Sequence, residues 1–367
     1  MTTDFPRTTT HPLPPSHRFR WLALLLVTLA PVAVCAPSVT GVGMAPIHIP
    51  DPVSGGQTDG YVFYPSPLPV DGTTAIGPYN VAAIPDAPAL PGAKPLVVIS
   101  HGHGGSRLGH HDLAAYLASH GFIVATLNHP KDDFEDAGGA GHIEVLAGRP
   151  IQVKSTITTL LGDPRWQNLI DANRIGVAGF SAGGYTSLLI AGAKPRFSRF
   201  IGYCERHPDD AQTCGDAPKF KAEAAKSGHT LEQVFDDMQG ELGRWGDTAD
   251  PRVKAAFVMA PLSLIFDEHG FDNVHIPLFL YYGQYDHVLL PDENARYIRP
   301  MLKTLVAVKE VPKADHWVFL PPCSDALAKD IGPLCSDPPG VDRAKVHAQI
   351  NADALAFFRK TLDVQGR

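Results

Sequence analysis

The sequence lacks several features that would assign it to common classes of protein. It has no run of lysine or arginine, and its net charge of −7 is spread over charges of both signs. This argues against nucleic acid or an anionic membrane surface as the main partner. No internal repeat is evident, and 367 residues with 44% hydrophobic content are enough for one large α/β domain.

The sequence also lacks an apolar stretch long enough for a transmembrane helix, which needs about 20 residues. Residues 21–34 form a stretch of 14 mostly apolar residues that follows Arg18 and Arg20. A basic region, a short apolar region and small residues after it are typical of a secretory signal peptide. We therefore predict that residues 1–36 are a signal peptide and that the mature chain, residues 37–367, has no transmembrane span.

The end of this segment leaves two forms of export open. Cleavage after Cys35 or Ala36 predicts a periplasmic or extracellular protein. Attachment of a lipid at Cys35 is the second interpretation, although Val34 differs from the small residues that precede the cysteine in lipoprotein signals.

Cysteine is rare, with five residues in the chain, and four of them follow the predicted signal peptide. An even number of cysteines in an exported protein suggests disulfides, and nearest neighbours pair Cys204 with Cys214 and Cys323 with Cys335. Each short loop contributes about 3 kcal/mol in the chain-entropy model. The spacings are wider than the C-x₂-C pairs of zinc sites.

Histidine is abundant, but its spacing argues against a metal centre. Six histidines fall in one third of the chain: His101, His103, His110, His111, His129 and His142. His110 and His111 are consecutive on a predicted helix and point about 100° apart, and no H-E-x-x-H spacing occurs. We predict that the protein requires no metal or other cofactor and that His101 is structural.

The mature chain predicts an α/β fold. Five short apolar runs without clean alternation are typical of strands that are buried on both faces: residues 95–100, 122–127, 174–179, 254–260 and 277–283. Helical patterns occur at residues 107–119, 149–161 and 341–361. This alternation predicts a mostly parallel central sheet of about eight strands with helices on both faces, preceded by a β region over residues 41–94.

Residues 197–250 form a long insertion in this pattern. They contain the Cys204/Cys214 loop and a helical stripe of apolar residues: Leu231, Val234, Met238 and Leu242. An insertion of this length is either a small cap over a site or a surface elaboration. We predict a cap.

A nucleophilic serine is predicted in the sequence GFSAGG, directly after the apolar run at residues 174–179. Gly179, Ser181 and Gly183 match G-x-S-x-G, the strained turn that exposes a serine hydroxyl between a strand and a helix. The position also suits a ligand site, because open α/β sheets bind ligands at the carboxyl ends of their strands. The alternative is a glycine-rich connection with an incidental serine.

A serine hydroxyl needs a base, and in this fold the partners follow in the order Ser, Asp, His. Asp286 follows the run at residues 277–283, and His316 follows a further predicted strand. We predict that Ser181 attacks, His316 transfers the proton and Asp286 orients the imidazole. Other candidates for these roles are present in the sequence: Asp267 and Asp272 for the acid, and His287 and His347 for the base.

The negative charge formed on an attacked carbonyl oxygen needs hydrogen-bond donors. The sequence HGHGG at residues 101–105 contains Gly102 and Gly104, which allow the backbone to turn N–H groups toward the nucleophile. We predict the backbone N–H groups of His103 and Ala182 as this oxyanion hole.

Three further side chains are candidates for the substrate pocket. They are His129, Tyr185 and Trp317, each close in sequence to a predicted strand end or to the proposed base. Core packing is an equal alternative for each of them.

Several motifs together resemble the α/β-hydrolases grouped with dienelactone hydrolase and platelet-activating-factor acetylhydrolase. They are FYPS, SHGHGG, LASHGFIVATLNHP, RIGVAGFSAGG and ADHWVF, and they span most of residues 60–320. The resemblance implies a serine ester hydrolase with an eight-stranded core sheet. Two features depart from these relatives: dienelactone hydrolases use a cysteine nucleophile, and the acetylhydrolase acid follows the strand that corresponds to KAAFVMAP, which has no carboxylate here.

The sequence therefore predicts an exported serine hydrolase that cleaves a small-molecule carboxylic ester, with lipid-like esters included, through an acyl-enzyme. A serine peptidase or amidase of the same fold is the first alternative, because it would use the same residues. A non-catalytic binding protein that has kept the fold is the second.

Overall fold

The structure is a computed structural model that describes residues 1–4, 8–9, 11, 40–139, 141–210, 214–215 and 217–362. The chain divides into two units, Met1–Pro37 and Ser38–Arg367. Most of the predicted signal peptide, with Cys35 and its cleavage site, lies outside the described residues. Within the described ranges, no helix is both long and apolar enough to span a membrane.

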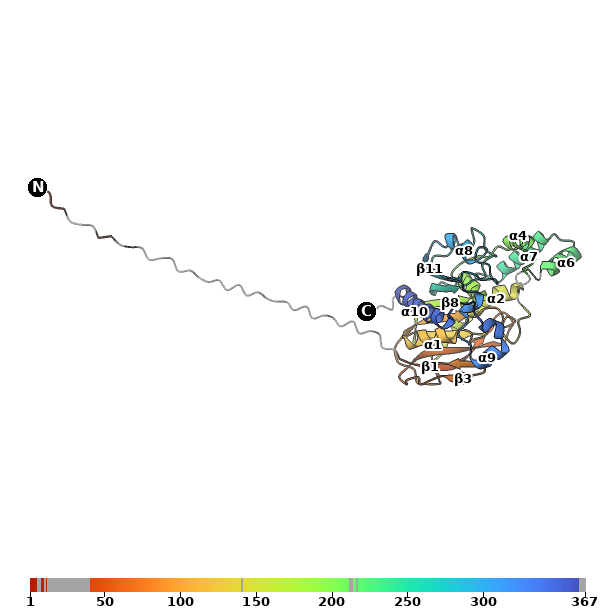
Figure 1. Ribbon diagram of the computed structural model, residues 1–367, viewed down its shortest axis with the longest axis horizontal. Helices are drawn as coiled ribbons and strands as arrows, with labels where there is room; N and C mark the ends of the chain where they lie inside the picture. Colours follow the sequence, from red (N-terminus) through yellow and green to blue (C-terminus); the bar gives the residue numbers. More distant parts are fainter. Residues whose placement is uncertain are drawn as a thin grey trace. The chain divides into compact units, whose positions relative to one another are not determined.

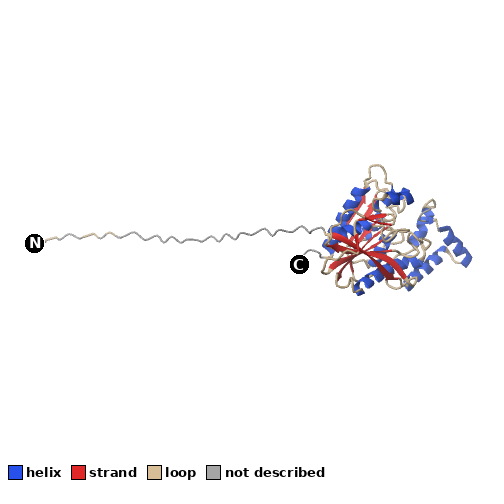
Figure 2. Cartoon of the chain, turned by 90° about the horizontal axis from the view of Figure 1, so that it is seen from below, coloured by secondary structure: helices blue, strands red, loops and turns tan. Residues whose placement is uncertain are grey.

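The second unit is built around a nine-stranded sheet with helices on both faces, as Figures 1 and 2 show. The strand order is β11-β10-β9-β8-β6-β7-β2-β1-β5. The strands are β1 (Gly41–Pro50), β2 (Gln57–Ser66), β5 (Ile84–Pro85), β6 (Lys94–Ser100), β7 (Ile123–Leu127), β8 (Ile170–Phe180), β9 (Val253–Met259), β10 (Leu278–Gly283) and β11 (Leu305–Val311). A separate hairpin joins β3 (Thr74–Ile76) to β4 (Tyr79–Val81).

The sheet is parallel from β7 to β11, whereas β2 pairs antiparallel with both β1 and β7. Strands β7 and β10 are buried at every residue, because helices cover both faces of the sheet there. The predicted α/β fold is confirmed. The expected strand number of about eight differs by one because of β5, a two-residue strand at the edge of the sheet.

The helices divide between the two faces. Helices α1 (His111–Ser119) and α10 (Arg343–Thr361) pack on one face, and α2 (Ile143–Gly162), α3 (Ala182–Ile190) and α8 (Ala295–Ile298) pack on the other. The remaining helices are α4 (Ser198–Arg206), α6 (Ala217–Ser227), α7 (Leu231–Arg244) and α9 (Asp325–Asp330), with short 3₁₀ turns η1 (Arg299–Met301), η2 (His316–Phe319) and η3 (Gly332–Cys335). Each face thus has its own apolar core.

Helix α2 shows how a proline inside a helix is accommodated. The sequence predicts a start at residue 149, but the helix begins at Ile143, so Pro150 lies within it. Proline has no N–H to donate to the carbonyl four residues earlier. That carbonyl, Leu146 O, accepts a hydrogen bond from the Tyr185 hydroxyl of α3 at 3.2 Å instead. The proline therefore creates a contact between α2 and the helix that follows Ser181.

The insertion at residues 197–250 contains α4, α6 and α7, which Figure 1 shows together at one side of the body. Thr230 and Gln233 form a reciprocal capping box at the start of α7. Phe197, Phe235 and Leu242 are buried in the core beside α2 and α3. The predicted disulfides are confirmed: Cys204–Cys214 lies within this insertion, and Cys323–Cys335 closes the segment that contains α9 and η3. The insertion's function as a cap over the site stays a prediction.

Candidate active site

Ser181 lies in a strained turn between β8 and α3. Its backbone has φ 55° and ψ −116°, a conformation that costs a non-glycine residue about 1–3 kcal/mol. Three hydrogen bonds hold it: Ser181 N donates to Met259 O at 2.9 Å, and Ser181 O accepts from Tyr185 N and Leu262 N at 3.1 Å each. The side chain remains partly exposed. The turn thus presents the hydroxyl at the carboxyl edge of the sheet.

Two glycines make this turn sterically feasible. A Cβ atom on Gly179 would lie 2.0 Å from Gly183 O, and a Cβ atom on Gly183 would lie 1.9 Å from Ser100 O. Both distances are far below contact distance, so any side chain at either position would force the turn apart. The packing supplies the physical reason for the G-x-S-x-G pattern.

His316 and Asp286 form a buried pair beside this turn. His316 Nδ1 and Asp286 Oδ2 lie 2.7 Å apart. The other carboxylate oxygen, Oδ1, accepts hydrogen bonds from the backbone N–H groups of Val288 at 3.0 Å and Leu289 at 2.7 Å. The carboxylate is therefore held in one orientation, and its contact with Nδ1 fixes the imidazole tautomer.

The imidazole of His316 packs against the residue before the nucleophile. Its ring centroid lies 4.7 Å from that of Phe180, the last residue of β8. Because a carboxylate accepts from Nδ1, Nε2 is the nitrogen available as a base. In the described part of the chain, Ser181 Oγ and His316 Nε2 are not hydrogen-bonded to one another. Such contacts often tighten only when substrate binds.

The other candidates for the acid and the base have different partners. Asp267 lies 3.4 Å from Arg196, and Asp272 pairs with His269 and Lys303. His287 pairs with Asp315 at 2.6 Å, and His347 pairs with Asp112 at 2.6 Å. Of the carboxylates predicted from the sequence, Asp286 is the one in contact with His316.

The loop after β6 lies against the serine turn. A Cβ atom on Gly102 would lie 3.3 Å from Ser181 Cβ, and Gly104 has a positive φ of 63° that turns the chain. Ala182 is the first residue of α3, so its N–H has no acceptor within the helix. Among the residues that the structure describes, neither the His103 N–H nor the Ala182 N–H donates a hydrogen bond to the protein. Within those residues, neither group is thus already bonded to a protein acceptor, and their function as the oxyanion hole stays a prediction.

The predicted pocket residues occupy different surroundings. His129 and Tyr185 are 0% exposed, and His129 contacts Ser100 Oγ at 2.8 Å and Gln152 Oε1 at 2.7 Å. The structure therefore places both side chains in the core. Trp317 is partly exposed and packs edge-on against His316, with 5.1 Å between ring centroids.

A buried polar cluster lies beneath the loop after β6, and sequence reasoning missed two of its members, Asp132 and Arg149. The guanidinium of Arg149 lies 2.5 Å from the carboxylate of Asp132. Burial and then the charge of Arg149 lower the pKa of His101 to about 3, so this histidine is neutral at ordinary pH. Burial also lowers the pKa of His129. The two histidines are thus structural members of the cluster.

No group of three or more His, Cys, Asp or Glu side chains that would hold a metal ion occurs within the described residues. The predicted absence of a metal or cofactor stays a prediction.

Comparisons with known proteins agree with this fold. A family model for platelet-activating factor acetylhydrolase, isoform II, matches residues 72–135, which include the loop after β6 but end before Ser181. A solved structure of a ferulic acid esterase from Streptomyces cinnamoneus matches with a TM-score of 0.58 and 20% identity, over 91% of this chain and 94% of that one. No curated protein matches the sequence. The protein therefore has the α/β-hydrolase fold, and its residues 72–135 are similar to platelet-activating factor acetylhydrolases.

Proposed function

We propose that this protein is an exported serine hydrolase that cleaves carboxylic esters through Ser181, His316 and Asp286. The observation that carries the proposal is the buried hydrogen bond between His316 Nδ1 and Asp286 Oδ2, next to a serine held in a strained turn. A strained, partly exposed serine and an oriented imidazole are the two requirements of a nucleophile activated by a base.

The reaction has two halves. His316 Nε2 takes the proton from Ser181 Oγ as the oxygen attacks the ester carbonyl, and Asp286 stabilises the imidazolium that forms. The backbone N–H groups of His103 and Ala182 stabilise the carbonyl oxygen as it becomes negative. The tetrahedral intermediate then expels the alcohol, which receives the proton from His316. A water molecule, activated by the same nitrogen, attacks the acyl-enzyme and releases the carboxylic acid.

The names of the matched proteins favour an ester over an amide. The family model describes an acetylhydrolase, and the solved structure is of an esterase. We propose a small-molecule ester as the substrate, and lipid-like esters are within this class. An alcohol is also a better leaving group than an amine, so the proposed catalytic residues would cleave an ester more easily than an amide.

The test uses the purified chain with p-nitrophenyl esters from acetate to long acyl chains, and with a p-nitroanilide. We expect ester turnover that Ser181→Ala abolishes without a large change in melting temperature. Ser227→Ala, which removes an exposed serine in α6, is the control and should keep full activity and full labelling by a fluorophosphonate. Retained turnover in Ser181→Ala contradicts the proposal, and preference for the anilide favours a peptidase or amidase instead.

Export is a separate part of the proposal. It rests on the predicted signal peptide at residues 1–36, and the two disulfides support it because such bonds persist in oxidising compartments. Mass spectrometry of the mature protein should find an N-terminus next to Cys35 or Ala36. An added lipid mass that disappears in Cys35→Ser would favour membrane anchoring, and an intact N-terminus would contradict export by cleavage.

A further inference from the structure

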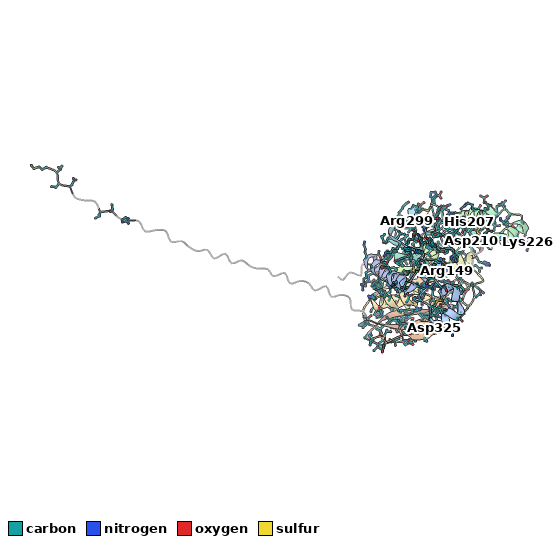
Figure 3. The ribbon with its side chains drawn as sticks, in the orientation of Figure 1. Arg149, His207, Asp210, Lys226, Arg299 and Asp325 are labelled. Carbon is teal, nitrogen blue, oxygen red and sulfur yellow. A yellow bond between two sulfur atoms is a disulfide. The ribbon has the colours of Figure 1, made fainter. Side chains whose placement is uncertain are left out.

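Arg149 is a fully buried cation within hydrogen-bond reach of three segments around the proposed site. Its side chain is 1% exposed, and Figure 3 labels it near the middle of the projected body. Its guanidinium donates to Asp132 Oδ2 at 2.5 Å, to Thr186 Oγ1 at 3.0 Å, to Ser100 Oγ at 3.3 Å and to His101 O. These acceptors belong to the loop after β7, to helix α3 and to the junction of β6 with the loop that follows it.

One arm of this network leads to His103. The carboxylate of Asp132 accepts from Arg149 through Oδ2 and contacts His103 Nδ1 through Oδ1. Burial opposes ionisation of Asp132, but the charge of Arg149 and the bond to His103 hold its pKa below the usual value. The side chain of His103 is half-exposed while Asp132 is buried. The carboxylate therefore ties the proposed oxyanion loop to the buried guanidinium.

The other arm leads to Ala182. The hydroxyl of Thr186 accepts from Arg149 Nε and donates its proton to Ala182 O at 2.9 Å. Ala182 is the second residue whose N–H we assign to the oxyanion hole, and it directly follows Ser181. One guanidinium is thus linked to both residues whose N–H groups are the proposed donors, through Asp132 to the His103 imidazole and through Thr186 to Ala182 O.

Burial of the Arg149 guanidinium is unfavourable for the stability of the fold. A buried cation loses its hydration, and one carboxylate with neutral acceptors offsets this free-energy cost only when the geometry is close to ideal. An apolar residue of similar volume would fill the same space without that cost. Preorganised donors, in turn, contribute to catalysis only when their spacing matches the developing oxyanion. Arg149 therefore lies where a rigid connection would keep the two proposed N–H donors at a fixed spacing.

We propose that Arg149 is a positioning residue that sets the relative position of the His103 and Ala182 N–H groups, through Asp132 on one side and Thr186 on the other. This inference rests on the proposed function. Oxyanion contacts form in the transition state rather than in the bound substrate, so loosening them lowers kcat and leaves KM nearly unchanged. A purely structural role would instead lower the amount of folded protein without changing kcat per folded molecule.

The test compares two threonines in chemically similar positions. Thr186→Val removes the link to α3 but keeps the side-chain volume and the pair between Arg149 and Asp132. Thr158→Val is the matched control, because Thr158 Oγ1 also accepts from an arginine, Arg252 at 3.0 Å, and donates to the carbonyl four residues earlier, Lys154 O at 2.9 Å. It lies on the exposed side of α2. Asp132→Asn tests the other arm.

Steady-state kinetics on a p-nitrophenyl ester, active-site titration with a fluorophosphonate and thermal unfolding are measured for each variant. We expect Thr186→Val to lower kcat per titrated site by about 10- to 100-fold, with KM within about twofold. Its affinity for a trifluoromethyl ketone transition-state analogue should fall by a similar factor, and Thr158→Val should match the wild type. Arg149→Lys should also have a lower kcat per titrated site, because a single ammonium group cannot hydrogen-bond to both Asp132 and Thr186.

Two outcomes overturn the inference. Wild-type kcat per titrated site in both Thr186→Val and Asp132→Asn would show that the network has no effect on the donors. A rise in KM at constant kcat would assign the network to substrate binding. If Asp132→Asn does not fold, Thr186→Val decides alone. Failure of the proposed function is distinct: the wild type would then show no turnover or labelling that depends on Ser181.

Discussion

Two histidine–aspartate pairs of almost the same geometry lie near each other in the fold, and they differ at one nitrogen. His316 Nδ1 lies 2.7 Å from Asp286 Oδ2, and His347 Nδ1 lies 2.6 Å from Asp112 Oδ2. His347 Nε2 also donates to the carbonyl of Val318 at 3.0 Å. The corresponding nitrogen of His316 has no hydrogen-bond partner among the residues described.

This difference allows only His316 to act as the proposed base and gives His347 a supporting role. A carbonyl oxygen only accepts, so Nε2 of His347 carries a proton and cannot take another. Val318 belongs to η2, the turn that begins with His316. The second pair therefore holds the segment that carries the first, and a histidine beside a carboxylate is not by itself evidence of catalysis. The two pairs differ in whether Nε2, the imidazole nitrogen away from the carboxylate, has a hydrogen-bond partner.

The largest expected effect comes from replacing His316, whose Nε2 is free, with glutamine. His316→Gln should lower kcat for ester hydrolysis by about 10⁶-fold, because no group is left to take the serine proton. Stopped-flow or long-incubation assays on a p-nitrophenyl ester measure it. His347→Gln is the matched comparison and should lose less than about tenfold. Equal losses in the two variants would break the distinction drawn above.

A smaller loss is expected when the base keeps its ring but loses its carboxylate. Asp286→Asn should lower kcat by about 10⁴-fold, because the amide no longer favours the correct tautomer or stabilises the imidazolium. Melting temperature and fluorophosphonate labelling rates measured alongside separate this effect from unfolding. Asp272→Asn, which changes an exposed pair with His269 and Lys303, should leave kcat unchanged. A larger effect there would reassign the acid.

The supporting pair should respond in stability. His347→Gln removes the imidazole that contacts the largely buried carboxylate of Asp112, and the loss of such a buried hydrogen bond costs about 1–3 kcal/mol in the free energy of unfolding. Urea denaturation followed by circular dichroism measures this loss. Wild-type stability combined with a large fall in kcat would instead make His347 part of the chemistry.

The smallest expected effect is on the pH dependence of the unfolding free energy, and it concerns His110, the residue before α1. Burial lowers the pKa of His110 to about 4, so the folded protein keeps this ring neutral while the unfolded chain takes up a proton. Stability should therefore decrease as pH falls from about 6.5 to about 4, by at most about 3 kcal/mol from this residue. His110 Nε2 has no hydrogen-bond partner within the described residues.

His110→Phe removes the titration and should make the pH dependence of the unfolding free energy shallower across this range. His275→Asn, at an exposed position, is the control and should reproduce the wild-type slope. An unchanged slope in His110→Phe would mean that His110 does not determine the acid sensitivity.

Much of the fold could be predicted from local patterns. The apolar runs at residues 95–100 and 122–127 became β6 and β7, because strands buried on both faces need continuous apolar sequence. The helix around residue 149 was placed six residues too late, since Pro150 resembles a helix start. Only the contact between Leu146 O and the Tyr185 hydroxyl explains how the helix continues through it.

The site divides in the same way. The order of Ser181, Asp286 and His316 and the spacing of the glycines were evident from the chain alone, because each follows a predicted strand. Asp132 and Arg149 were not, since their partners come from segments that are distant in sequence. The burial of His129 and Tyr185 was equally hidden, because a residue type does not reveal which way its side chain points.

The sequence by itself determined the class of fold, the two disulfide pairs and the candidate nucleophile, acid and base, because strand periodicity, cysteine spacing and turn chemistry are local. Tertiary structure alone decided which histidine keeps a free nitrogen, which carboxylate contacts that histidine and which side chains hold the proposed oxyanion loop. Those properties depend on distances between groups far apart along the chain, and only the packing of the sheet and its helices sets such distances.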